Sequence, residues 1–167
     1  MAAMRTAFAF PPVVNEKAAR AVAGQVAVVT VLALVTGWLW LAPVLAVGFA
    51  LRVASGPRFD PFGRLATKVM APRLGAPVLV PGPPKRFAQA VGLVFTLAAT
   101  GFLLAGVPVV TTALLAVLLL FATLEAVVGF CAGCYVFGLL MRVGLVPEET
   151  CAACNDISLR NRETAAA

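Results

Sequence analysis

Histidine is absent from this chain of 167 residues, and charged residues make up only 12% of it. Without histidine, the chain lacks the commonest general base and the commonest metal ligand of proteins. Catalysis or metal binding would therefore have to use cysteine, carboxylate or backbone groups. The sequence also lacks a phosphate-binding glycine loop, a catalytic triad and a nucleic-acid motif. We therefore expect no nucleic-acid partner.

Apolar residues are in large excess. They make up 62% of the chain, whereas a soluble domain has about 45–50%. The net charge of +6 comes from basic residues that lie between apolar runs. This placement indicates that the basic residues flank the lipid bilayer. The first 20 residues lack the apolar core of a cleavable signal. We therefore expect the first long apolar run to stay in the protein as an anchor.

The apolar runs predict an all-α fold, an integral membrane four-helix bundle. Residues 21–51 carry no charge, and this run is too long for one span of about 20 residues. We expect two spans there, joined by a tight turn; one long kinked helix is the alternative. The expected spans are 18–37, 39–54, 86–105 and 107–130.

The apolar pattern continues beyond the fourth span, to about residue 141. The last helix must then leave the membrane or break near Gly129, because its full length exceeds the hydrocarbon thickness of about 30 Å. The predicted membrane domain thus covers residues 1–141. A polar cytoplasmic tail follows at 142–167.

Residues 52–86 form a central loop that is rich in proline and basic residues. We expect Lys85 and Arg86 to contact lipid headgroups. A short interfacial helix from Pro61 to Met70 is one interpretation of the loop, and an irregular proline-stiffened segment is the other. Basic residues mark the cytoplasmic side of a membrane. The chain is therefore predicted to be a multi-pass protein of the bacterial inner membrane with both termini in the cytoplasm.

Two C-x-x-C pairs contain all four cysteines: Cys131 with Cys134, and Cys151 with Cys154. One interpretation is a redox pair at Cys131 and Cys134, with the tail cysteines as a relay or resolving pair. Residues at positions i and i+3 of a helix share one face, so two thiols can meet there. If the helix breaks at Gly129, Cys131 begins a new helix, where a thiolate is stabilised; an unbroken helix would disfavour it.

A metal site is the alternative interpretation of the four cysteines. Their spacing suits a four-thiolate zinc site, and an iron–sulfur cluster is a further option. The third interpretation is that the cysteines are small apolar side chains without a function. The predicted cytoplasmic position argues against a lasting structural disulfide. It also argues against the quinone-coupled disulfide-forming membrane enzymes, whose cysteines act on the oxidising side.

Glu125 is the acidic residue of the fourth predicted span, six positions before Cys131. A charge at bilayer depth is costly, so such a residue suggests a function. It could relay protons to the thiols. The other interpretation is a protonated Glu125 that is hydrogen-bonded to Thr96 or Thr100 of a neighbouring helix.

Three motifs resemble a largely actinobacterial family of small membrane proteins catalogued only as a domain of unknown function. They are Ala71-Pro72-Arg73-Leu74-Gly75, Pro84-Lys85-Arg86-Phe87-Ala88-Gln89, and Gly129-Phe130-Cys131-Ala132-Gly133-Cys134-Tyr135. The resemblance covers about residues 12–141 and leaves Cys151 and Cys154 outside. It implies four spans and a membrane location, and associates the chain with thioredoxin-like and rhodanese-like proteins.

The leading hypothesis is therefore a cytoplasm-facing membrane thiol protein, without a cofactor, that works with a soluble thioredoxin-like or rhodanese-like partner in thiol redox or sulfur transfer. The alternative is a zinc or iron–sulfur site in a structural or assembly subunit of a larger membrane complex. The residues leave open whether the chain is an enzyme.

Overall fold

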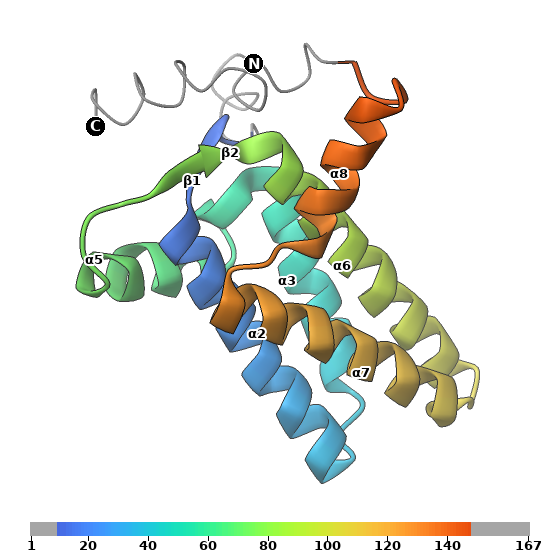
Figure 1. Ribbon diagram of the computed structural model, residues 1–167. Coiled ribbons are helices and arrows are strands. Elements are labelled where there is room, and N and C mark those ends of the chain that lie inside the picture. Colours follow the sequence, from blue (N-terminus) through green and yellow to red (C-terminus); the bar gives the residue numbers. More distant parts are fainter. Residues whose placement is uncertain (1–9, 148–167) are drawn as a thin grey trace, which may run out of the picture.

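The computed structural model describes residues 10–147 and shows a helical bundle (Figure 1), which confirms the predicted fold class. Three of its helical segments are long and apolar enough to cross a membrane. They are α2 (Glu16–Thr36), α6 (Gly82–Leu104), and α7 (Pro108–Thr123) with the π-helical turn η3 (Leu124–Val128). The chain is therefore a membrane protein.

The expected second span is the shorter helix α3 (Leu41–Ser55) of 15 residues. At 1.5 Å per residue it is about 22 Å long, less than the hydrocarbon core of about 30 Å. The chain forms two helices here rather than one kinked helix, because α2 ends at Gly37 in the left-handed conformation, with φ of 73°. Trp38 and Trp40 lie exposed at this turn, as expected of interfacial anchors.

Small residues allow the helices of the bundle to pack closely. Helix α6 contacts both α3 and α7, and α2 packs on α7. Ala33, Ala42 and Ala99 are fully buried, around the larger Leu45 and Leu115. Large apolar side chains cover the outside of the same helices. Such an arrangement suits a bundle whose outer surface faces lipid.

The segment between α3 and α6 contains the predicted short helix. The 3₁₀ turn η1 (Gly56–Arg58) is followed by a helical stretch of α4 (Pro61–Leu65), the π-helical turn η2 (Ala66–Met70) and α5 (Ala71–Arg73). Asp60 caps this stretch, since its carboxylate accepts a hydrogen bond from the Gly63 amide at 2.6 Å. The interpretation as an irregular loop is wrong.

Two short strands, which the sequence did not suggest, fasten the N-terminal arm to the end of the central loop. Strand β1 (Val13–Asn15) pairs antiparallel with β2 (Leu79–Pro81). Strand β1 leads directly into α2, and β2 leads into α6. This ladder therefore holds the first turns of α2 and α6 together, at the end of the bundle where α8 also lies (Figure 1).

Candidate thiol site at a helix break

The helix that contains Glu125 does not continue through the cysteines. It ends at Gly129, which is left-handed with φ of 78°, and α8 (Ala132–Arg142) begins after Cys131. Cys131 is the N-cap of α8, and its sulfur accepts a hydrogen bond from the Cys134 amide at 3.2 Å. Of the two alternatives left open by the sequence, the structure shows the helix-start cysteine.

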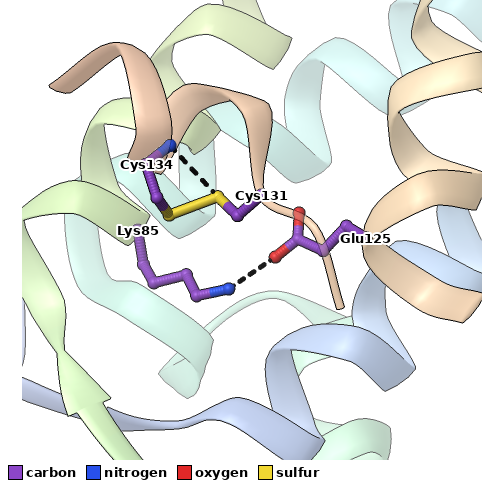
Figure 2. The surroundings of a disulfide bond; sticks show 4 residues. All are labelled: Lys85, Glu125, Cys131 and Cys134. Carbon is purple, nitrogen blue, oxygen red and sulfur yellow. Dashed lines mark hydrogen bonds and ion pairs between the residues drawn. A yellow bond between two sulfur atoms is a disulfide. The ribbon is translucent and has the colours of Figure 1, made fainter. Parts of the chain in front are cut away.

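Cys131 and Cys134 are joined in a disulfide across the first turn of α8 (Figure 2). The start of α8 is held against α6 at Gly133, where a Cβ atom would lie only 2.6 Å from Cα of Ala88. Any side chain at position 133 would push the two helices apart. The thiol pair is thus fixed to the first half of α6.

Arg20 of α2 stabilises the break itself. Its guanidinium donates hydrogen bonds to the Ala126 carbonyl, at 3.2 Å from both Nε and Nη2, and from Nη2 to the Val127 carbonyl at 2.7 Å. Carbonyls at the end of a helix lack partners within that helix, and a cation there also complements the helix dipole. The break is therefore secured from a segment more than 100 residues away in the sequence.

Glu125 forms an ion pair with Lys85, with 2.8 Å between Oε1 and Nζ, directly beside the disulfide (Figure 2). The predicted hydrogen bonds of Glu125 to Thr96 or Thr100 are wrong, since both hydroxyls donate to carbonyls of their own helix. The expected headgroup contact of Lys85 is also wrong, because its ammonium group binds Glu125 and its side chain is only 10% exposed. Because α6 and α7 are antiparallel, the first turn of α6 lies beside the last turns of α7.

Two hollows meet at the cysteines. The inner cavity has a volume of about 280 Å³, lies among α2, α3, α6 and α7, and is lined by Glu125 and Cys131 as well as apolar side chains. The outer groove has a volume of about 450 Å³ and is lined by both cysteines, Lys85 and Tyr135. Cys131 borders both, so the disulfide separates the interior of the bundle from an open surface.

Comparison with protein-family models matches residues 14–142 to "Domain of unknown function (DUF4395)". The chain belongs to the DUF4395 family. This confirms the family resemblance inferred from the sequence motifs. No curated protein and no solved structure matches the chain. In the DUF4395 chain, Cys131, Cys134, Glu125 and Lys85 all fall inside the matched region.

A second ion pair in this DUF4395 protein lies deeper and farther from the cysteines. Arg52 of α3 binds Asp60 at 2.8 Å, and their side chains are only 4% and 1% exposed. Arg52 also donates from Nε to Gln89 Oε1 at 2.8 Å and stacks over the Phe49 ring at 4.4 Å. In the sequence Arg52 resembled an ordinary cation at a membrane edge, so this pair was missed.

The four-cysteine metal site of the DUF4395 chain is not tested, because Cys151 and Cys154 lie outside the described residues. Within residues 10–147, no three histidine, cysteine or acidic side chains come together as metal ligands would. The proposed relay through Cys151 and Cys154 also stays a prediction, because both residues lie outside residues 10–147.

Proposed function

We propose that this DUF4395 protein is a membrane thiol–disulfide protein that exchanges electrons or sulfur with a soluble thioredoxin-like or rhodanese-like partner. The observation that carries the proposal is the Cys131–Cys134 disulfide at the start of α8, on the wall of the outer groove. Both cysteines line this groove, so a partner protein would approach the pair from there. Cys151 and Cys154 would then serve as the relay or resolving pair.

The surroundings of Cys131 favour the thiolate, which is the form that attacks a disulfide. Amide groups at a helix N-terminus and nearby cations both stabilise negative charge on sulfur. At the N-cap of α8, the sulfur of Cys131 accepts a hydrogen bond from the Cys134 amide. Lys85, which borders the outer groove beside both cysteines, supplies the cation. In the reduced pair, Cys131 is therefore the cysteine that attacks a partner disulfide, and Cys134 is the cysteine that closes the disulfide again.

Charge placement supports a cytoplasmic orientation of the pair. The exposed basic side chains of the central loop, Arg64, Lys68 and Arg73, lie on α4, η2 and α5. These elements and α8 gather at the same end of the bundle (Figure 1). By the positive-inside rule this end faces the cytoplasm. We accordingly propose four passes through the inner membrane of an actinobacterial cell, with α3 as the short second span and both termini inside.

The exchange reaction would proceed through a mixed disulfide. A partner thiolate attacks Cys131 Sγ, the S–S bond to Cys134 breaks, and Cys134 takes the electron pair as thiolate. The partner's second thiolate then attacks the partner sulfur of the mixed disulfide, and Cys131 is released as a thiolate. The partner dithiol is thereby oxidised to a disulfide, and the membrane pair is reduced. With a rhodanese-like persulfide as donor, the Cys131 thiolate would instead attack the outer sulfur atom. The S–S bond of the donor breaks, Cys131 becomes the persulfide, and the donor cysteine leaves as thiolate.

Trapping of the mixed disulfide tests the proposal. The full chain with Cys151→Ser and Cys154→Ser isolates the membrane pair, and Cys134→Ser or Cys131→Ser is then added. Each variant is mixed in detergent with thioredoxin that lacks its resolving cysteine and was activated as an aromatic mixed disulfide. We expect Cys134→Ser to form about tenfold more protein–protein mixed disulfide on a non-reducing gel than Cys131→Ser. Equal and negligible trapping in both variants would refute the proposal.

A further inference from the structure

Four phenylalanine rings line the inner cavity among aliphatic side chains. Phe49, Phe87, Phe95 and Phe121 line it from α3, α6 and α7. Its volume of about 280 Å³ lies near the lower end of small-molecule pockets, which hold about 300–1,000 Å³. Such a lining suits a flat, apolar ring system, because aromatic side chains stack on one at low cost in conformational entropy.

A few polar side chains interrupt the apolar lining of this cavity. Gln89 and Glu125 join Cys131 in its wall, and Glu125 is held in place by Lys85 at 2.8 Å. A ligand in the cavity would thus meet a sulfur, a carboxylate and an amide, with phenyl rings elsewhere. This arrangement fits a molecule that is apolar over most of its surface and bears oxygen atoms on its ring.

The cavity also communicates with the outer, apolar surface of the bundle. Val91 of α6 and Phe121 of α7 line the cavity and are nevertheless 36% and 42% exposed. Both belong to segments long and apolar enough to lie in a bilayer. A ligand dissolved in lipid can therefore reach the cavity sideways, between α6 and α7, without passing through water.

We infer that the inner cavity binds the ring of a lipid-soluble quinone, which exchanges two electrons with the Cys131–Cys134 pair. This rests on the proposed thiol function and deepens it by naming the second reactant. A soluble partner would react from the outer groove, and the quinone would react from the inner cavity. Cys131 borders both hollows, so one sulfur atom connects a water-soluble reactant with a lipid-soluble one.

The reaction balances with these reactants alone. The two thiols lose their S–H bonds, and one S–S bond forms between Cys131 and Cys134. The two electrons reduce the quinone, and the two protons end on its ring oxygens, giving a quinol. Glu125 stands at the cavity wall beside Cys131 and can pass a proton to a ring oxygen. With thiols on the cytoplasmic side, electrons would flow from the soluble dithiol partner into the quinone pool.

Quinone oxidation of the reduced pair tests the inference. The full chain with Cys151→Ser and Cys154→Ser is reduced, freed of reductant and placed in proteoliposomes. The probe is decylubiquinone, whose ring is fully substituted, so that it oxidises thiols without being arylated by them. Quinol formation is followed by absorbance, and remaining thiols are counted from maleimide mass shifts. We expect one quinol per disulfide formed.

Matched tryptophan substitutions locate the reaction. Val91→Trp should block the opening and slow quinol formation by about tenfold or more. Val94→Trp lies on the same helix but outside the cavity lining, and Val94 is 64% exposed. This control should stay within about twofold of the parent. Ala122→Leu, which fills the cavity from α7, gives a second variant should Val91→Trp fold poorly.

The outcomes separate the two proposals. If decylubiquinone leaves the reduced pair unoxidised while thioredoxin still exchanges with it, the cavity holds only lipid chains and the quinone inference is overturned. Equal slowing by Val91→Trp and Val94→Trp overturns it as well. If neither reactant exchanges with the pair, the thiol function itself fails.

Discussion

Two ion pairs within residues 10–147 have the same length and different surroundings. Arg52–Asp60 and Lys85–Glu125 both measure 2.8 Å. The Arg52–Asp60 pair is more deeply buried, with side chains 4% and 1% exposed, and is surrounded by Gln89, Phe49 and the cap of α4. The Lys85–Glu125 pair is 10% and 14% exposed and borders two hollows and a disulfide.

This difference shows which pair is structural and which can take part in chemistry. Arg52 and Asp60 connect α3 to the start of the central-loop helix, and neither of them lines the inner cavity or the outer groove beside the cysteines. Glu125, by contrast, shares a cavity wall with Cys131, and Lys85 shares the outer groove with it. The Arg52–Asp60 pair thus stabilises the fold, whereas the Lys85–Glu125 pair lies beside the disulfide, where the proposed chemistry would take place.

Removal of Asp60 should have the largest effect. Asp60→Ala leaves the buried Arg52 charge without its partner, and breaking a buried pair in this way costs about 3–5 kcal/mol of unfolding free energy. Asp60→Asn keeps the cap of α4 and should be more stable than Asp60→Ala by about 1 kcal/mol. Unfolding in detergent, followed by circular dichroism, measures both. A wild-type stability for Asp60→Ala would show that the Arg52 pair is not structural.

Neutralisation of Glu125 should act on rate more than on stability. Glu125→Gln removes the carboxylate beside Cys131, and we expect oxidation of the reduced pair by decylubiquinone to slow by about tenfold, or about 1.4 kcal/mol. Its unfolding free energy should fall less than that of Asp60→Ala, because the Lys85 pair is partly solvated. Asp60→Asn is the control and should react at the parental rate per folded molecule. If the two variants slow equally, the contrast between the pairs is false.

Substitution at the helix break should have the smallest effect on stability. Gly129→Ala places a Cβ on a left-handed backbone, at a cost of about 1 kcal/mol. The new Cβ would lie 3.5 Å from Arg20 and Glu16, which is ordinary contact, so the cost is conformational. Gly101→Ala, in the last turn of α6 with open space around it, should instead stabilise by up to about 0.5 kcal/mol. The midpoints of thermal unfolding compare the stabilities of the two variants. A stabilising effect of Gly129→Ala would argue that the helix is continuous at this position.

Local sequence signals predicted the helices well. The uncharged runs and Gly37 indicated α2 and α3, and Pro61 indicated the helix of the central loop. The thiol pair was also apparent, since i and i+3 spacing brings two cysteines together on any helix. Asp60 directly before Pro61 is a helix-start signal, and it could have revealed the cap that Asp60 provides.

Contacts between distant segments could not be predicted in this way. Strands β1 and β2 have three residues each, too few for a recognisable pattern. Arg52, Lys85 and Glu125 had no visible partners in the sequence, because ion pairs between helices depend on how those helices are packed. The tail cysteines, Cys151 and Cys154, remain a prediction.

By itself, the sequence determined a membrane-embedded helical chain with a C-x-x-C pair, because hydrophobic length and residue spacing are local properties. Tertiary structure alone decided that Cys131 begins a helix, since Arg20 of α2 binds the carbonyls that the break exposes. It also decided that Cys131 lies between an inner cavity and an outer groove. Both features arise where the first turns of α6 and α8 meet the last turns of α7, and only packing of the whole bundle brings these ends together.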